Sequence, residues 1–290
     1  MATDFGLKMQ VDENIKIDFE PAPTEKEKKT LLTKSNETAE PELNLIGLIK
    51  KCLAEFVGTM FLCLTVALSV GMDRWDAPIA IGFSLGCLVF ALRHISGANF
   101  NPAVSFAIWL RGRLDTITMF AYMQAQLGGA ILGGSVARFV MEDWCKHDNG
   151  TIVTTFSECG DEMIARSCIS GYPSPDNSVS FLTAFLVETI FTFGLVLVYL
   201  NVAESDANAG NSFYGLAIGH TVTFGVIAGG GISGGAFNPV VGFALPIVHG
   251  VTDDIPLYLL GPFVGATFAA SFFMFTAKRS EFMEKEIKKE

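Results

Sequence analysis

The tripeptide Asn-Pro-x occurs twice in this chain, each time between long apolar stretches that carry almost no charge. The first copy is Asn101-Pro102-Ala103, preceded by His-Ile-Ser-Gly-Ala, and the second is Asn238-Pro239-Val240, preceded by Ile-Ser-Gly-Gly-Ala. Proline fits the first turn of a helix, where its missing N–H is not needed. The pair therefore predicts two short helices that begin at Asn-Pro and meet at the midplane of a bilayer.

Composition assigns the class. Half of the residues are hydrophobic, 17% are charged and 25 are phenylalanine. A soluble chain this apolar would expose large hydrophobic patches, so the bilayer is the expected solvent. The net charge of −10 is concentrated outside the apolar stretches and argues against a nucleic-acid partner.

Six apolar runs are long enough to cross a bilayer, which needs about 20 residues per helix. Two further segments, Asn101–Arg111 and Asn238–His249, are too short to span. The predicted fold class is therefore an all-α membrane protein with six transmembrane helices plus two half-helices. Residues 1–44 are predicted to be a disordered polar tail, 45–277 the membrane domain and 278–290 a second tail. The six spans are roughly 45–71, 77–94, 115–141, 179–201, 213–230 and 255–277.

The two halves of the membrane domain resemble each other. Glu55 recurs as Glu188 after 133 residues, Gly82 as Gly219 after 137, and the two motif asparagines are also 137 apart. Repeat one covers about 45–141 and repeat two about 179–277. Because each repeat has three spans, the second copy must be inverted in the membrane.

Basic residues beside the spans predict the orientation. Positive charge gathers on the side that holds both termini, which makes that side cytoplasmic; the residues are Lys50, Lys51, Arg93, Arg111, Arg113 and the Lys and Arg residues after 277. The segment around 142–178 then lies outside and contains a glycosylation sequon at Asn149. The sequence leaves open whether the membrane is the plasma membrane or that of an intracellular vesicle or vacuole.

These features resemble the aquaporin (major intrinsic protein) family. The resemblance covers about residues 45–277 and rests on the doubled motif, the acids Glu55 and Glu188, and Gly261-Pro262-Phe263. It implies a passive channel for water and small neutral solutes and a homotetramer in the lipid bilayer. The sequence shows no Walker loop, His-Glu-x-x-His motif or nucleophile elbow, so we expect no enzymatic activity and no cofactor. The second motif departs from the family pattern, with Val240 in place of alanine and Val241 in place of arginine.

The resemblance also implies how the motifs act. Each half-helix directs a positive N-terminus at the pore centre, where Asn101 and Asn238 donate to a passing oxygen, reorient single-file water and oppose protons and cations. Simple N-capping is the alternative reading of these asparagines. Glu55 and Glu188 are expected to accept N–H bonds from the backbone ahead of each half-helix, with a proton relay as the alternative.

The family's selectivity ring, carried over by spacing from the motifs, falls on Ile81, Val226, Gly235 and Val241. All four are apolar, so the ring is expected to be wide enough for glycerol, urea, ammonia or peroxide. Tyr258 resembles water channels and Leu259 the glycerol-conducting branch, which leaves the solute open. An ion- or proton-leaky channel and a low-permeability structural membrane protein are the alternatives.

A gate is predicted at the cytoplasmic mouth. The segment Val202–Ser212 is expected to be flexible, with Ser205 within it and Phe213 and Tyr214 following as rings that could cover the pore; an ordinary solvated loop is the alternative. His94 is weighed as a residue of the same mouth, and His220 as a packing residue off the pore face. Cys145, Cys159 and Cys168 share the outside segment and allow one disulfide. Cys52, Cys63 and Cys87 are expected to pack within spans.

Overall fold

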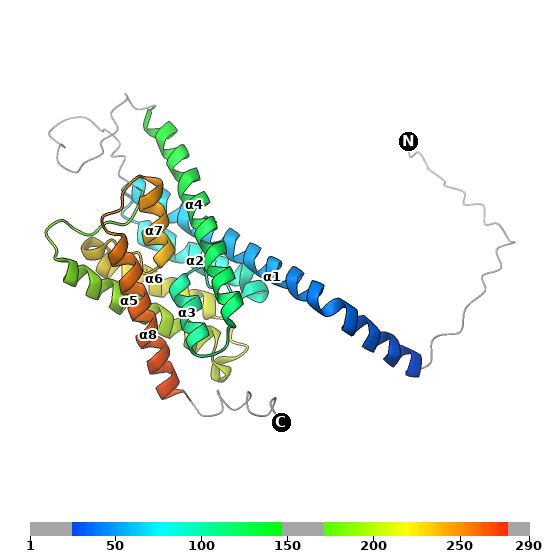
Figure 1. Cartoon of the computed structure of the whole chain (residues 1–290). Coiled ribbons are helices and arrows are strands. Elements are labelled where there is room, and N and C mark those ends of the chain that lie inside the picture. The colour runs from blue at the N-terminus through cyan, green and yellow to red at the C-terminus, as the bar shows by residue number, and fades with distance from the viewer. Residues whose placement is uncertain (1–24, 147–170, 278–290) are drawn as a thin grey trace, which may run out of the picture. The chain divides into compact units, whose positions relative to one another are not determined.

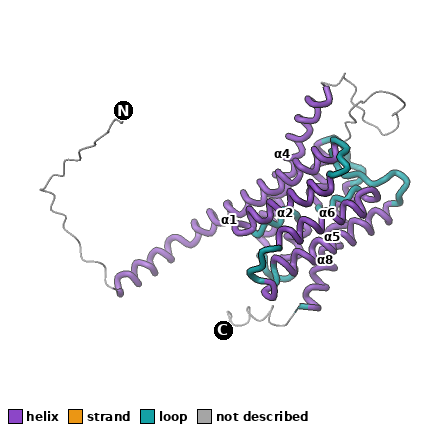
Figure 2. The backbone as a smooth tube through the Cα atoms, turned by 180° about the vertical axis from the view of Figure 1, so that it is seen from behind, coloured by secondary structure: helices purple, strands orange, loops and turns teal. Residues whose placement is uncertain are grey.

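A computed structural model describes the backbone of residues 25–146 and 171–277, and the side chains of residues 45–143 and 171–277. Within these ranges the chain is helical and has no strand (Figure 2). The helices, in order, are α1 (Glu25–Gly71), α2 (Ala77–Ser96), α3 (Pro102–Leu110), α4 (Thr116–Lys146), α5 (Phe181–Ala203), the 3-10 turn η1 (Asp206–Asn208), α6 (Tyr214–Ser233), α7 (Pro239–Val248) and α8 (Ile255–Thr276).

Five helices are long and apolar enough to cross a membrane: Leu45–Gly71 of α1, and α2, α5, α6 and α8. The third predicted span is α4, which has 31 residues and so exceeds the length that crossing needs. Its hydropathy is lower because Gln124, Gln126 and several glycines lie within it. The half-helices α3 and α7 have 9 and 10 residues, which is too short to span.

The N-terminal boundary differs from the prediction. α1 begins at Glu25 rather than near residue 45, so the disordered tail predicted for 1–44 is wrong from Glu25 onward. Glutamate and lysine are good helix formers, and Glu25 and Lys29 stand four residues apart, the spacing at which opposite charges stabilise a helix. Residues 25–46 form a unit of their own, separate from the unit that begins at Gly47.

Close packing in the bundle relies on glycine where helices face each other. A Cβ atom on Gly82 of α2 or Gly219 of α6 would overlap the backbone of the facing glycine's helix. The same holds for Gly129 of α4 against α1 and for Gly265 of α8 against α5. Small residues allow transmembrane helices to approach in this way, and dispersion and weak polar contacts then hold them together.

The ends of α2 and α6 turn the chain into the half-helices. Gly97 and Gly234 adopt the left-handed conformation there, with φ of 98° and 89°, which favours glycine because a Cβ atom would be strained. Figure 1 shows α3 in cyan-green and α7 in orange, both within the bundle of longer helices. The predicted glycosylation site at Asn149 and the side chains of Cys145, Cys159 and Cys168 lie outside the described residues. Of the described cysteines, Cys52, Cys63 and Cys87 are free.

Candidate functional site

The two half-helices begin in the same way. Asn101 and Asn238 are the N-cap residues of α3 and α7, with φ of −154° and −152°. The Oδ1 atom of Asn101 accepts from the N–H of Ala103 at 2.9 Å, and that of Asn238 accepts from the N–H of Val240 at 3.1 Å. Each side-chain oxygen is therefore used to cap its own helix.

The amide nitrogens of the same two side chains link the half-helices to each other. Asn101 Nδ2 donates to the carbonyl of Phe237 and Asn238 Nδ2 donates to the carbonyl of Phe100, both at 2.9 Å. Each amide has two N–H hydrogens, and among the described residues no other group accepts the second one. Capping and pore lining are thus compatible, because the oxygen caps the helix while an N–H remains for the cavity.

A buried glutamate holds the irregular backbone before each half-helix. Glu55 accepts from the N–H groups of Asn99 and Phe100 at 2.9 and 2.7 Å, and Glu188 accepts from those of Ala236 and Phe237 at 3.1 and 2.8 Å. Phe100 and Phe237 have φ of 51° and 47°, a conformation that bulky residues rarely adopt. The carboxylates stabilise this strained turn by bonding its N–H groups.

Further polar groups surround each glutamate. Ser96 Oγ and Gln126 Nε2 donate to Glu55 at 2.6 and 2.8 Å, and Ser233 Oγ donates to Glu188 at 2.7 Å. Two tyrosines occupy corresponding places: Tyr122 donates to the carbonyl of Ser96 and Tyr258 to that of Ser233, both at 2.7 Å. The inverted repeat therefore extends to the side chains that support the motifs.

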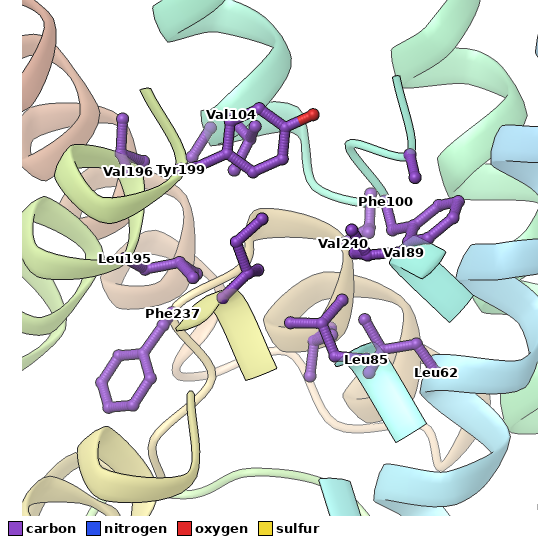
Figure 3. Close-up of a cluster of buried hydrophobic side chains, with 14 of the residues drawn as sticks. Leu62, Leu85, Val89, Phe100, Val104, Leu195, Val196, Tyr199, Phe237 and Val240 are labelled. Atoms are coloured by element: carbon purple, nitrogen blue, oxygen red, sulfur yellow. The ribbon is translucent and has the colours of Figure 1, made fainter. Parts of the chain in front are cut away.

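One cavity is lined by residues of both half-helix motifs and of the helices around them. It has about 690 Å³ of empty space, including the part open to solvent. The two motif asparagines line it, and so do all four residues assigned to the selectivity ring: Ile81, Val226, Gly235 and Val241. Most of the remaining lining is aliphatic, and Figure 3 shows several of these side chains, among them Leu62, Leu85, Val104 and Leu195. A solute inside would find few polar partners apart from the asparagines.

Three arginines mark one end of the bundle, which we call the arginine end. Arg93 donates to the carbonyl of Ala203, Arg111 to that of Glu204 at 2.8 Å, and Arg113 pairs with Asp206 at 2.8 Å. The opposite end contains Pro173, whose neighbour Ser174 packs against Gly234, and we call it the Pro173 end. Burial raises the pKa of Glu204, although the nearby positive charges of Arg111, Arg93 and Arg113 act in the other direction.

The segment predicted to be a flexible gate is ordered by its own hydrogen bonds. Ser205 caps η1 by accepting from the N–H of Ala207, and Asn211 Nδ2 donates to the carbonyls of Val202 and Asn208, both at 2.7 Å. Asparagine and serine side chains here satisfy the backbone in place of water, so a gate in this segment would have to break these bonds.

The three candidate gate residues do not line the cavity. Phe213 is half exposed, and Tyr214 packs against Phe90 and beneath the guanidinium of Arg93, whose carbon lies 5.0 Å from the ring centre. Ser205 is buried in its turn. His94 and His220 do not line the cavity either; His220 lies on the exposed face of α6, with Nδ1 2.7 Å from the carbonyl of Leu216.

Sequence reasoning missed two polar residues that line the cavity, Asn99 and Tyr199. Asn99 precedes the first motif by two positions and can be found by its place in the re-entrant segment. Tyr199 lies within an apolar helix and gives no local signal. It becomes visible only when α5 is aligned with α1 at the 133-residue offset, where a tyrosine replaces Val66.

A helical membrane bundle in which two capped half-helices face a common cavity from opposite directions defines a channel built from an inverted repeat. The comparison with known families identifies which one. Residues 42–273 match the Major intrinsic protein family, and the chain belongs to this family.

Individual relatives agree. Nodulin-26 of Glycine max is 33% identical over 242 residues, which cover 80% of each chain. The glycerol uptake facilitator protein-like 6 of Lactiplantibacillus plantarum is 30% identical over 77% of this chain and 95% of its own. The fold is similar to the X-ray structure of the aquaglyceroporin from Plasmodium falciparum, with a TM-score of 0.65, 21% identity and coverage of 81% of this chain and 98% of that one.

The protein is therefore a multi-pass integral membrane protein and a passive channel for water and small solutes, not an enzyme.

Proposed function

We propose that the pathway conducts neutral solutes of the size of glycerol or urea in addition to water. The observation that carries this proposal is the lining at the four ring positions. Ile81, Val226 and Val241 contribute aliphatic side chains, and Gly235 contributes none. Selectivity in such channels depends on pore diameter, on lining donors and acceptors, and on electrostatic barriers; this ring has no charged side chain and no side-chain donor.

The relatives support both solute classes. They include proteins named aquaporin and one named glycerol uptake facilitator protein-like 6. A ring without a fixed positive charge gives a carbon-bearing solute an apolar surface for its CH groups, while the motif asparagines serve its hydroxyl or carbonyl groups. We therefore place the barrier to cations at the two half-helix N-termini, whose partial positive charges converge on Asn101 and Asn238.

Stopped-flow measurements on proteoliposomes test this function. The wild type should raise osmotic water permeability and glycerol or urea permeability above those of empty liposomes. Val241→Arg adds bulk, positive charge and donors at the ring, and we expect glycerol permeability to fall by roughly tenfold relative to water. Val241→Leu is the matched control for bulk alone and should lower it less. An unchanged ratio in Val241→Arg would show that Val241 is not part of the ring.

A second candidate function, ion or proton conduction, follows from the same uncharged ring. Current under voltage clamp would reveal it, and we expect none above background because the half-helix dipoles oppose cations. A protein that swells vesicles and also carries a proton current would contradict the assignment of the cation barrier to the motifs.

We further propose that the arginine end is cytoplasmic and that both termini lie there. Lys50, Lys51, Arg93, Arg111 and Arg113 support this orientation by the positive-inside rule. Protease protection of a tag at each terminus in sealed, oriented vesicles tests it. Glycosylation of Asn149 after expression in a cell that glycosylates membrane proteins would support an outside location of that segment.

Assembly and gating are proposals of the same kind. The family resemblance supports a homotetramer, which native mass spectrometry in mild detergent tests. A gate at the arginine end would have to release Tyr214 from Arg93 before either Phe213 or Tyr214 could reach the pathway. Tyr214→Ala should then raise water permeability at equal protein density, whereas equal permeability would remove the support for a gate in this segment.

A further inference from the structure

The cavity is asymmetric about the pseudo-twofold axis that relates the two repeats. At the Pro173 end it is lined by Val70, Val226, Gly234, Gly235 and Ala236. The offsets of 133 and 137 residues give their counterparts at the arginine end: Ala203, Val89, Gly97, Ala98 and Asn99. Of these counterparts only Asn99 lines the cavity. This cavity therefore reaches the Pro173 end, and toward the arginine end it extends to Asn99 but not to the other four counterparts.

The largest difference between paired lining residues lies where the cavity stops. Val66 of α1 and Tyr199 of α5 both line it, at corresponding positions. Tyr199 is fully buried and lies one helical turn before Ala203, the residue whose carbonyl Arg93 binds. Figure 3 shows its ring reaching from α5 toward the segment that carries Phe100. A phenol ring thus occupies space that a valine leaves open in the other half.

Hydrogen bonds fix this ring across the pathway. Tyr199 Oη lies 2.6 Å from the carbonyl oxygen of Gly97 and 2.8 Å from the side-chain amide of Asn99. A hydroxyl has one hydrogen, and a carbonyl can only accept, so Tyr199 donates to Gly97. The Asn99 amide is then satisfied when its NH₂ group donates to Tyr199 Oη and its oxygen accepts from Ser105 Oγ. The amide atom that faces Ser105 lies 3.0 Å from Oγ.

This arrangement continues to the support of the first motif. Ser105 Oγ also accepts a hydrogen bond from Gln126 Nε2 at 3.0 Å, and Gln126 Nε2 donates to Glu55 as well. With the Asn99 amide turned as described, each hydrogen bond in the chain from Tyr199 to Glu55 joins a donor to an acceptor, although the buried Oε1 atom of Gln126 has no hydrogen-bond partner among the described residues. The Tyr199 hydroxyl is consequently occupied on both its donor and its acceptor side and presents to a solute mainly the bulk of its ring.

We propose that Tyr199 is a specificity-determining residue of this channel and that its ring sets the size of solute that passes the arginine end. The inference rests on the proposed function, and it assigns the size limit to Tyr199 rather than to the apolar ring near the Pro173 end. The wide ring there admits solutes that the phenol then discriminates, with water passing more readily than glycerol.

Three variants in proteoliposomes test the assignment. Tyr199→Val installs the residue found at the corresponding place in the first repeat, and Tyr199→Leu fills more of the space if the valine variant does not fold. For either variant we expect the ratio of glycerol to water permeability to rise by roughly an order of magnitude. Phe193→Leu is the matched control, because it removes an aromatic ring of the same helix α5 that packs against Phe272 and does not line the cavity; its ratio should stay that of the wild type.

The outcomes are separable. A ratio in Tyr199→Val or Tyr199→Leu equal to that of a conducting wild type overturns the role of Tyr199 and leaves the proposed function intact. A ratio that rises equally in Phe193→Leu also overturns it, since the effect would then come from a loosened bundle. If the wild type and all three variants, inserted at verified density, do not exceed empty liposomes for water or glycerol, the proposed function fails and this inference with it.

Discussion

Replacing Glu55 by glutamine tests whether the carboxylates hold the half-helices in place. Glu55 accepts four hydrogen bonds, from the N–H groups of Asn99 and Phe100 and from the side chains of Ser96 and Gln126. Glutamine has nearly the same shape but only one acceptor oxygen. Its NH₂ group must then face two of the four donors, where it can accept nothing.

The magnitude follows from the number of bonds lost. Each buried donor left without a partner costs about 1–3 kcal/mol, so two such donors cost about 2–6 kcal/mol. The loss falls either on Ser96 and Asn99, which share one carboxylate oxygen, or on Phe100 and Gln126, which share the other, and Phe100 already has an unfavourable φ of 51°. We therefore expect Glu55→Gln to lower stability strongly and to reduce water permeability, because the first half-helix loses its fixed position.

The assay is heat-induced loss of the monodisperse peak in detergent, followed by stopped-flow swelling of proteoliposomes. Glu142→Gln is the control, since Glu142 forms an exposed pair with Arg138 and pairs of that kind contribute about 0–1 kcal/mol. If Glu55→Gln melts within the range of Glu142→Gln and conducts like the wild type, the carboxylate does not hold the turn and the reasoning is refuted.

Three further perturbations have expected outcomes. Gly219→Leu should destabilise the bundle by about 1–3 kcal/mol or prevent folding, because even a Cβ atom there overlaps the backbone of α2; a melting curve like that of the wild type would contradict this. Asn238→Ala should weaken the exclusion of cations, measured as current under voltage clamp, since it removes the bond to Phe100 and a donor at the pore centre. Burial raises the folded-state pKa of Glu204 above its usual value of 4.5. The stability of the wild type should therefore decline as the pH rises from about 4.5 through the folded-state pKa, because the buried carboxyl loses its proton there. The melting temperature of Glu204→Gln should not show this decline with pH.

The half-helices were predictable from the sequence because proline and asparagine act locally. Asparagine caps and proline starts a helix through bonds within a few residues, and α3 and α7 begin at Pro102 and Pro239. The predicted targets of Glu55 and Glu188 were the backbone N–H groups ahead of each motif, and those groups donate to them. An acid inside a span needs partners, and the re-entrant backbone is the nearest set of unpaired donors.

Other features depend on contacts between distant segments and gave no local signal. The order of the segment 202–212 comes partly from Arg111 and Arg113, about 90 residues earlier in the chain, which bind Glu204 and Asp206. The composition of that segment is typical of a flexible loop, and only the folded bundle brings the arginines to it. The helix from Glu25 was missed for the opposite reason: polarity was read as disorder, although alternating glutamate and lysine also favour a solvated helix.

The inverted repeat explains why one residue that differs between the two halves changes the shape of the cavity. Each repeat contributes one set of lining residues, so the pore would be alike at both ends if the residues at every pair of corresponding positions were the same. The tyrosines that support the motifs do match, with Tyr122 and Tyr258 binding equivalent carbonyls. Where one repeat has Val66 and the other Tyr199, the lining differs in size and in hydrogen bonding. The asymmetric shape of the cavity thus arises in part from side chains that differ between the two repeats, and such positions are where this channel's own selectivity is to be sought.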